Sequence, residues 1–354
     1  MTELLRADRL TKHFTIGGSL SRRTLHAVDD VSFTIGEREI VALAGESGSG
    51  KSTVARLLAR VHTPTSGAIS FDGEPLSKIR GRKAGLRYSG AAPMVFQDPF
   101  SSLNPVFRVS HGVLRALRLH RSELSARERR AEAERVFDVV GLGADMLDRY
   151  PHELSGGQRQ RVGFAQALAT RPKLILADEP VSMLDVSIRI GLLNLMTRLR
   201  DEEGVSVLYI THDIASARYV ADRLIVMYAG QIAEAGPIDD VLADPRHPYT
   251  QLLLSAVPDP HAPPPSVAAL AAASGERGEP PKVIDPSPGC RFQPRCPISI
   301  DICGKITPVL APGVRPPATD ARAPAPGAGA PGAGEQREVA CHIAQMGTEV
   351  KAFT

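Results

Sequence analysis

The sequence predicts an α/β fold, because short apolar runs alternate with amphipathic segments as far as residue 257. The apolar runs have the length of buried strands and lie at 39–44, 174–177, 205–210 and 224–228. Segments with helical spacing of apolar residues lie at 51–61, 124–140, 155–169 and 188–199. Strands that alternate with helices in this way predict a parallel sheet with helices on both faces.

Length and composition fit one large domain with an addition, or two modest domains. The chain has 354 residues, of which 43% are hydrophobic and 23% charged. This composition is typical of a chain that forms a packed core. A net charge of +3 is too small to indicate nucleic acid as a partner. No apolar run approaches the ~20 residues that cross a bilayer, and the N-terminus lacks the apolar stretch of a secretory signal. We therefore expect a cytosolic protein that reaches a membrane only through a partner.

The composition changes after residue 257, where we place the end of the α/β domain (1–257). Segments 258–288 and 311–334 are rich in Pro, Ala and Gly, and they lack the apolar density that offsets chain entropy. They are therefore expected to be flexible linkers. Residues 258–354 form a predicted small, irregular extension that contains all four cysteines. The sequence shows no internal repeat, which indicates a single copy of the α/β domain.

Residues 45–52, Gly-Glu-Ser-Gly-Ser-Gly-Lys-Ser, match a phosphate-binding loop that follows a buried strand and precedes a helix. Glycines let backbone N–H groups turn toward phosphates, and the helix N-terminus adds a favourable dipole. Lys51 is expected to reach the β- and γ-phosphates, and Ser52 to ligate Mg²⁺. The predicted nucleotide contacts of this loop are Gly45, Ser47, Gly48, Gly50, Lys51, Ser52 and Thr53. A chance Gly-Ser loop is the alternative, which the strand–loop–helix context disfavours.

The apolar run at 174–177 ends in two carboxylates, Asp178 and Glu179. In open α/β sheets the carboxyl ends of the strands form the usual ligand edge. Asp178 is expected to hold Mg²⁺, because hard cations favour oxygen ligands. Glu179 is expected to orient and polarise the attacking water as a general base. Such a pair alone often marks a solvated strand end, but its position after the phosphate loop favours a catalytic role.

Four further motifs resemble those of ATP-binding cassette ATPases over residues 1–257. They are Gln97 in Val-Phe-Gln-Asp-Pro, Leu-Ser-Gly-Gly-Gln at 154–158, Ser-Met-Leu-Asp at 182–185, and His212 in Ile-Thr-His-Asp. The resemblance implies an α/β P-loop NTPase core with a mixed sheet and a helical signature subdomain at about residues 98–170. It also implies ATP and Mg²⁺ as cofactors and ATP hydrolysis as the activity.

The resemblance gives three of these motifs a role in the nucleotide site or at an interface. Gln97 would touch Mg²⁺ and water, and His212 would contact the γ-phosphate, so both would act in catalysis. Asp185 would lie in the loop that crosses an interface between two cassettes. Phe14 is the candidate for the aromatic residue that stacks on adenine. A core phenylalanine is the alternative, and residues 17–24 resemble an insertion that moves Phe14 away from the phosphate loop.

The motif at 154–158 opens a predicted helix, whose free N–H groups and dipole favour an anion. In the family this anion is the γ-phosphate of ATP bound to the opposite subunit. Ser155, Gly157 and Gln158 would therefore serve the ATP of a partner. The ATP site is then shared between two subunits, and a single chain would be incomplete as an enzyme.

Two segments narrow the resemblance to the ATPases of oligopeptide and dipeptide transporters. They are Phe-Gln-Asp-Pro-Phe-Ser-Ser-Leu-Asn-Pro at 96–105 and Arg-His-Pro-Tyr-Thr-Gln-Leu-Leu-Leu-Ser-Ala-Val-Pro at 246–258. Such importers use two different ATPases, and Asp-Glu-Pro-Val-Ser at 178–182 is similar to the second of the pair. Met183 and Gln166 replace an alanine and an arginine that are usual in the family. They are expected to affect interface packing or nucleotide contacts.

The narrower resemblance implies a heterodimer with a second ATPase subunit, two transmembrane permeases and an extracytoplasmic solute-binding protein. The loop at 98–106 would meet the permeases, so the chain would work peripherally at the cytoplasmic face of a bacterial cell membrane. The expected function is ATP-driven import of oligopeptides or dipeptides. Alternatives are an import ATPase for nickel or another solute, a soluble cassette protein of translation or DNA repair, and an ATPase-dead regulatory subunit.

The four cysteines, Cys290, Cys296, Cys303 and Cys341, all lie in the extension. Cytosolic proteins seldom use structural disulfides. Four thiols are able to hold an iron–sulfur cluster or a tetrahedral zinc ion, although zinc sites usually show close C-x2-C pairs, which this chain lacks. Some peptide-transporter ATPases carry a [4Fe–4S] cluster in this region, which is the ligand we favour over zinc and over unligated thiols. His342 is an alternative ligand to one cysteine.

Overall fold

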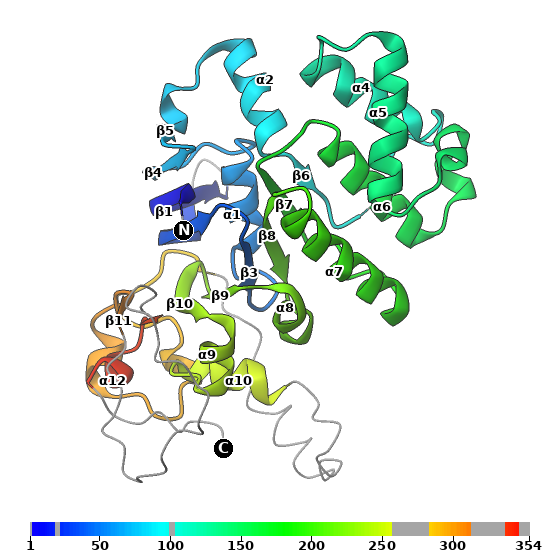
Figure 1. The fold of residues 1–354 in the computed structure, drawn as a ribbon. Helices are drawn as coiled ribbons and strands as arrows, with labels where there is room; N and C mark the ends of the chain where they lie inside the picture. The colour runs from blue at the N-terminus through cyan, green and yellow to red at the C-terminus, as the bar shows by residue number, and fades with distance from the viewer. Residues whose placement is uncertain (1, 18–21, 99–102, 257–282, 313–336, 347–354) are drawn as a thin grey trace. The chain divides into compact units, whose positions relative to one another are not determined.

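The structure is a computed structural model. It describes residues 2–17, 22–98, 103–256, 283–312 and 337–346. The chain forms two compact units (Figure 1). The first unit consists of Met1–Lys12, Ser32–Leu43 and Ser52–Asp222. The second unit consists of His13–Val31, Ala44–Lys51 and Arg223–Thr354.

The first unit contains an antiparallel sheet that the sequence analysis did not predict. Its strands follow the order β2-β1-β4-β5, and their bounds are Arg23–Gly36, Glu3–Ile16, Ser66–Phe71 and Glu74–Pro75. Residues 13–16 of β1 and 23–31 of β2 are part of the second unit. Strand β1 pairs antiparallel with β4, with Leu5 opposite Phe71. Leu5 and Ala7 are buried whereas Arg6 and Asp8 are exposed, the alternation expected of a strand with one face on the core.

The other sheet strands of the first unit are buried on both faces. They follow the order β3-β8-β7-β6, with bounds Ile40–Ala44, Ser206–Thr211, Leu174–Asp178 and Met94–Val95. Strand β7 runs parallel to both neighbours, with Leu176 opposite Met94 on one side and Leu208 on the other. Every residue of β3, β7 and β8 is buried, which explains why these strands appear as continuous apolar runs. The predicted strands are confirmed.

Helices of the first unit follow the predicted pattern and add several that the sequence analysis did not mark. The α-helices are α1 (Lys51–Leu58), α2 (Gly81–Ala91), α4 (Ser110–His120), α5 (Ala126–Val139), α6 (Gly156–Leu168), α7 (Val186–Asp201) and α8 (Ile214–Val220). Short 3₁₀ helices span Leu76–Lys78, Ala144–Asp148 and Pro151–Glu153. Helices α4, α5 and α6 pack against one another (Figure 1). They lie within residues 98–170, for which the helical signature subdomain stays a prediction.

The second unit contains strands and short helices from the C-terminal part of the chain. Its strands follow the order β11-β12-β10-β9, with bounds Ala311–Pro312, Glu338–Val339, Gln231–Pro237 and Arg223–Tyr228. Its helices are α9 (Ile238–Ala243), α10 (Pro248–Ser255), α12 (His342–Gln345) and the 3₁₀ helices Gln293–Arg295 and Asp301–Gly304. The pairing of Glu234 with Val339 brings the end of the extension back onto β10. Antiparallel pairs here and parallel pairs in the first unit account for the predicted mixture of strand directions.

Among the described residues, no helix combines the length and apolar character needed to cross a membrane. The first predicted linker falls outside the described residues except for its end at 283–288, and the second except for its start at 311–312. Residues 99–102 of the loop expected to meet permeases also fall outside them.

Candidate functional site

The predicted phosphate loop belongs to the second unit as far as Lys51. Its glycines have positive φ angles, a backbone conformation that favours glycine. Gly50 has a φ of +106°, and a Cβ there would lie 2.4 Å from the carbonyl oxygen of Ala27. Gly48 has a φ of +78°, and a Cβ there would meet nothing within 4 Å. One glycine is therefore required by close packing, whereas the other is required by backbone conformation alone.

Lys51, the first residue of α1, is almost fully buried and folds back over this loop. Its Nζ donates hydrogen bonds to the carbonyl oxygens of Gly45 at 2.7 Å and Glu46 at 2.9 Å. A buried ammonium needs acceptors, and here the loop backbone supplies them. The ammonium is thus held within the loop that the sequence assigns to phosphates.

In the first unit, the next residue, Ser52, meets Asp178 at the end of β7. The Ser52 Oγ donates a hydrogen bond to Asp178 Oδ1 at 3.0 Å. The Asp178 side chain is buried, with 6% of its surface exposed. The Ser52 hydroxyl on α1 and the Asp178 carboxylate on β7 form a set of oxygen ligands that suits Mg²⁺, which prefers oxygen and keeps part of its water shell. The residues present therefore fit the predicted ion.

Glu179 lies at the centre of the other predicted catalytic residues. Its Oε2 accepts a hydrogen bond from Gln97 Nε2 at 3.0 Å and lies 3.3 Å from His212 Nδ1. Gln97 also donates to Ser182 Oγ at 3.3 Å. Glu179 has a φ of +47°, a conformation that is uncommon outside glycine. The three residues expected to act in catalysis are thus brought together.

Ser155 and Gln158 cap their own helix. Ser155 Oγ accepts from the Gln158 N–H at 3.2 Å, while Gln158 Oε1 accepts from the Ser155 N–H at 2.9 Å. This reciprocal capping box fixes the start of α6, and its pattern, Ser-x-x-Gln, is visible in the sequence. Gly157 is buried, and a Cβ there would lie 2.2 Å from Ile188 Cγ2. The role of these residues toward a partner's ATP stays a prediction.

The remaining predicted positions are scattered. Asp185 precedes α7 as its N-cap residue but makes no side-chain capping bond. Met183 is 63% exposed. Gln166 packs inside the helical region, because a Cβ on Gly112 of α4 would lie 2.2 Å from its Nε2. Phe14, in the second unit near the end of β1, is half-buried rather than a core residue, so its adenine-stacking role stays a prediction.

Comparisons with known proteins agree with this geometry. A family described as "ABC transporter" matches residues 28–182, and one described as "Oligopeptide/dipeptide transporter, C-terminal region" matches residues 233–303. The chain is 43% identical over 314 residues to a probable peptide ABC transporter ATP-binding protein of Sinorhizobium fredii, covering 87% of this chain and 86% of that protein. It is 47% identical over 234 residues to the oligopeptide transport ATP-binding protein OppF of Streptococcus mutans, covering 66% and 76%.

A solved dimeric ATP-binding cassette in a post-hydrolysis state, bound to ADP and Pi, matches with a TM-score of 0.59 and 29% identity, covering 66% of this chain and 99% of that one. The fold and the site therefore define an ATP-binding cassette ATPase. The chain belongs to the family of ABC transporter ATP-binding proteins that carry the oligopeptide/dipeptide transporter C-terminal region. The predicted family, P-loop NTPase fold and ATPase class are confirmed.

The four cysteines of the extension are free thiols. Zn–S bonds of about 2.3 Å require the sulfur atoms of a single zinc site to lie within about 4.6 Å of one another. No three of these sulfur atoms lie within 4.8 Å of one another among the described residues, and His342 contacts the Ile306 carbonyl oxygen. Their arrangement does not fit a single zinc ion, and neither it nor the relatives' descriptions directly support the predicted [4Fe–4S] cluster.

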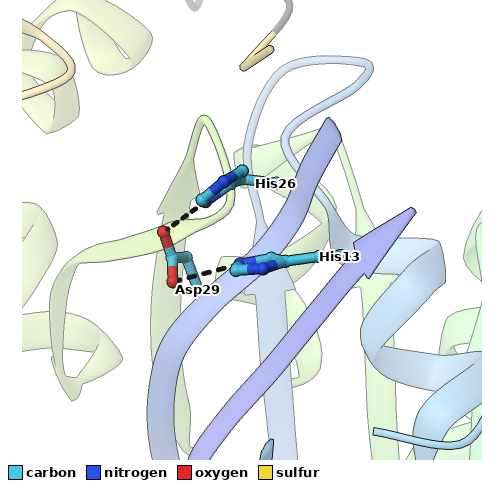
Figure 2. Close-up of side chains that lie close together, drawn as sticks. All are labelled: His13, His26 and Asp29. Atoms are coloured by element: carbon cyan, nitrogen blue, oxygen red, sulfur yellow. Dashed lines mark hydrogen bonds and ion pairs between the residues drawn. The ribbon is translucent and has the colours of Figure 1, made fainter. Parts of the chain in front are cut away.

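Sequence reasoning missed a cluster of two histidines and an aspartate in the second unit. Figure 2 shows His13 from β1 and His26 from β2 directed at Asp29, with contacts of 3.5 and 3.1 Å to its carboxylate. Arg291 of the extension also donates to this carboxylate. Burial opposes ionisation of Asp29, but His26 and Arg291 together lower its pKa. Arg291 already balances the charge of Asp29. We therefore infer that the cluster links strands β1 and β2 to the extension.

Proposed function

We propose that this protein is the ATP-hydrolysing subunit that powers a membrane importer of oligopeptides or dipeptides. The observation that carries the proposal is the convergence of Gln97 and His212 on Glu179, one residue beyond the Asp178–Ser52 pair. The match of residues 233–303 to the C-terminal region of oligopeptide and dipeptide transporters supports the solute class. The named relatives, which are peptide and oligopeptide transport ATP-binding proteins, support it as well.

The residues would divide the work of hydrolysis by the chemistry each can supply. Ser52 and Asp178 would hold Mg²⁺, which neutralises charge on the phosphates when bound. The phosphate loop and Lys51 would bind the β- and γ-phosphates. Phosphoryl transfer needs little covalent help from the protein, so positioning and charge stabilisation account for most of the rate.

Glu179 would accept a proton from an attacking water. Its carboxylate has an amide donor, Gln97, on one side and the His212 imidazole nearby. These contacts orient the carboxylate. His212 is 57% exposed on its side chain, so it remains accessible to a γ-phosphate. Carboxylate, amide and imidazole would therefore act as one hydrolytic group.

The proposal includes partners that complete the site. Ser155, Gly157 and Gln158 would face the ATP of a second ATPase subunit, because a helix N-terminus favours an anion. Two permeases and an extracytoplasmic solute-binding protein would convert closure of the ATPase pair into transport at the cytoplasmic face of the membrane. The solute would be selected by those other subunits.

We also propose that the four cysteines of the extension share an iron–sulfur cluster. The Cys290 N–H donates a hydrogen bond to the Cys303 carbonyl oxygen at 2.7 Å, which brings two of the four cysteines together. Burial, and to a smaller extent the neighbouring thiols, raise the pKa of Cys290 to about 11. A cluster spreads its cysteine ligands over several iron atoms and tolerates wider spacing than a single ion. The test is iron and sulfide content after anaerobic purification, with Cys341→Ser as the variant. Iron-free wild-type protein would contradict the cluster.

The main proposal is tested in cells and in solution. Lys51→Ala in the chromosomal copy should abolish growth on di- or oligopeptides as the sole source of a required amino acid, while free amino acid restores growth. Glu123→Gln, an exposed surface change in the same chain, is the matched control and should grow normally. Unimpaired peptide uptake by the Lys51→Ala strain would contradict the function.

A further inference from the structure

The segment Arg246–Tyr249, which the sequence analysis used only to recognise the subfamily, reaches the phosphate loop. Tyr249 lies in the first turn of α10 and is completely buried. Its hydroxyl oxygen accepts a hydrogen bond from the Glu46 backbone N–H at 2.8 Å. Glu46 is the second residue of the phosphate loop, so one side chain of this motif fixes the loop backbone directly. Both residues belong to the second unit.

A residue of the cysteine-containing extension binds the same glutamate. Arg295 donates two hydrogen bonds to the Glu46 carboxylate, at 3.0 and 3.2 Å, in the bidentate arrangement of strong arginine–carboxylate pairs. Its guanidinium lies 5.7 Å from the ring centre of Tyr228 and 5.8 Å from that of Phe292. Only 12% of the Arg295 side chain is exposed. Rings and carboxylate together hold this arginine in one orientation.

The support behind Tyr249 is a buried network. His247 Nδ1 accepts from the Tyr249 N–H at 3.0 Å and so caps the start of α10. The carboxylate of Glu234, which is completely buried, accepts from the backbone N–H groups of Arg246 and His247. Arg337 from the end of the extension is paired with Glu234 and supplies the countercharge. Tyr249 is therefore positioned by a network whose residues are not assigned to nucleotide binding or to catalysis.

Glu46 places a negative charge in a loop that must bind phosphates. Like charges a few ångströms apart repel, and the repulsion grows where water is excluded. The guanidinium of Arg295 neutralises this charge through its two hydrogen bonds to the Glu46 carboxylate. The same pair, with the Tyr249 hydroxyl, also restrains the loop backbone, which lowers the ordering cost of ligand binding.

We propose that Arg295 and Tyr249 are positioning residues through which the C-terminal extension sets the affinity of the phosphate loop for nucleotide. Arg295 neutralises Glu46, and Tyr249 holds its backbone N–H. The inference rests on the proposed binding of ATP at Gly45–Ser52. Neither residue is assigned contact with nucleotide, so both act through the loop.

Arg295→Gln is the decisive variant. We expect it to raise the ATP dissociation constant and KM about tenfold, equivalent to roughly 1.4 kcal/mol, with kcat within about twofold of wild type. The defect should shrink as salt is raised, because screening weakens repulsion between the uncompensated Glu46 and the phosphates. Arg23→Gln, which removes an exposed arginine paired with Asp285 in the same unit, is the matched control and should leave affinity unchanged.

The second substitution separates charge compensation from mere support of the fold. Glu46→Gln in the Arg295→Gln background removes the repelling carboxylate and should restore ATP affinity to within about threefold of wild type. Glu46→Gln alone should bind ATP at least as tightly as wild type. Loss of affinity in all three variants would overturn charge compensation, because it would mean that the pair only supports the structure.

Tyr249→Phe tests the second contact without emptying the core. It should weaken ATP binding about threefold, since one hydrogen bond to the loop is lost. Tyr88→Phe is the matched control, because the Tyr88 hydroxyl is also buried and donates to the Leu58 carbonyl oxygen, in the first unit. ATP affinity equal to that of wild type in both Tyr249→Phe and Arg295→Gln would overturn the proposal. Wild-type protein that bound no ATP would overturn the proposed function instead.

Discussion

Glu46 in the phosphate loop and Glu179 after strand β7 are held by different kinds of partner. The Glu46 carboxylate is paired with the guanidinium of Arg295, whose side chain is largely buried. Glu179 accepts from the neutral amide of Gln97 and lies beside the exposed imidazole of His212. An arginine forms a charged, bidentate pair with a carboxylate, whereas an amide donates a single neutral hydrogen bond. We propose that the first glutamate serves nucleotide binding and that the second serves hydrolysis.

The largest expected effect tests the Glu179 side of this comparison. Glu179→Gln keeps the shape of the side chain and its contact with Gln97 but cannot accept a proton. We expect kcat for ATP hydrolysis to fall about 10²- to 10⁴-fold, the usual contribution of a general base, while ATP still binds. Steady-state phosphate release and equilibrium nucleotide binding measure the two quantities. Turnover close to that of wild type would remove Glu179 from its assigned role.

The next prediction concerns His247 in the network behind Tyr249. Burial lowers the pKa of His247 from its usual 6.5 to about 4. Between these values the unfolded chain binds a proton that the folded chain does not, so stability is full above pH 6.5 and falls as the pH drops toward 4. The difference corresponds to about 3 kcal/mol. Urea unfolding at pH 7 and pH 4.5 should show this loss in wild type and a smaller loss in His247→Asn.

His152→Asn is the control for that experiment, because His152 is exposed. It should retain the pH dependence of wild type. A His247→Asn variant with unchanged pH dependence would show that the buried histidine does not titrate as the structure indicates.

The smallest effect is expected at the capping box of α6. Ser155→Ala removes the acceptor for the Gln158 N–H and should lower the free energy of unfolding by about 1 kcal/mol. Ser155→Thr preserves an oxygen and should recover most of this loss. If both variants keep wild-type stability but lose ATPase activity in the assembled transporter, Ser155 serves the partner's nucleotide and contributes little to its own helix.

Local patterns predicted the parts of the site that local geometry determines. Strands β3, β7 and β8 are buried on both faces, so they appear as largely apolar runs. The phosphate loop follows β3, and Asp178 is the last residue of β7. The antiparallel strand β1 was missed even though its alternation was present in the sequence. Ser155 and Gln158 also fit a capping box, a pattern that went unused because the family signature explained the same residues.

The contacts that escaped prediction join residues far apart in the chain. Arg295 and Glu46 are 249 positions apart, and Arg291 and Asp29 are 262 apart. Nothing in the spacing of a single sequence reports such pairings, because they depend on how the extension folds back within the second unit. His247 and Tyr249 were recognised as a family motif, but only the structure shows that the motif ends on the phosphate loop.

The division between a binding glutamate and a catalytic glutamate is tested most directly by measuring ATP affinity and ATP hydrolysis side by side in Glu179→Gln and Arg295→Gln. The account predicts that Glu179→Gln keeps its affinity and loses hydrolysis, while Arg295→Gln loses affinity and keeps kcat at saturating ATP. Loss of the same property in both variants would contradict it.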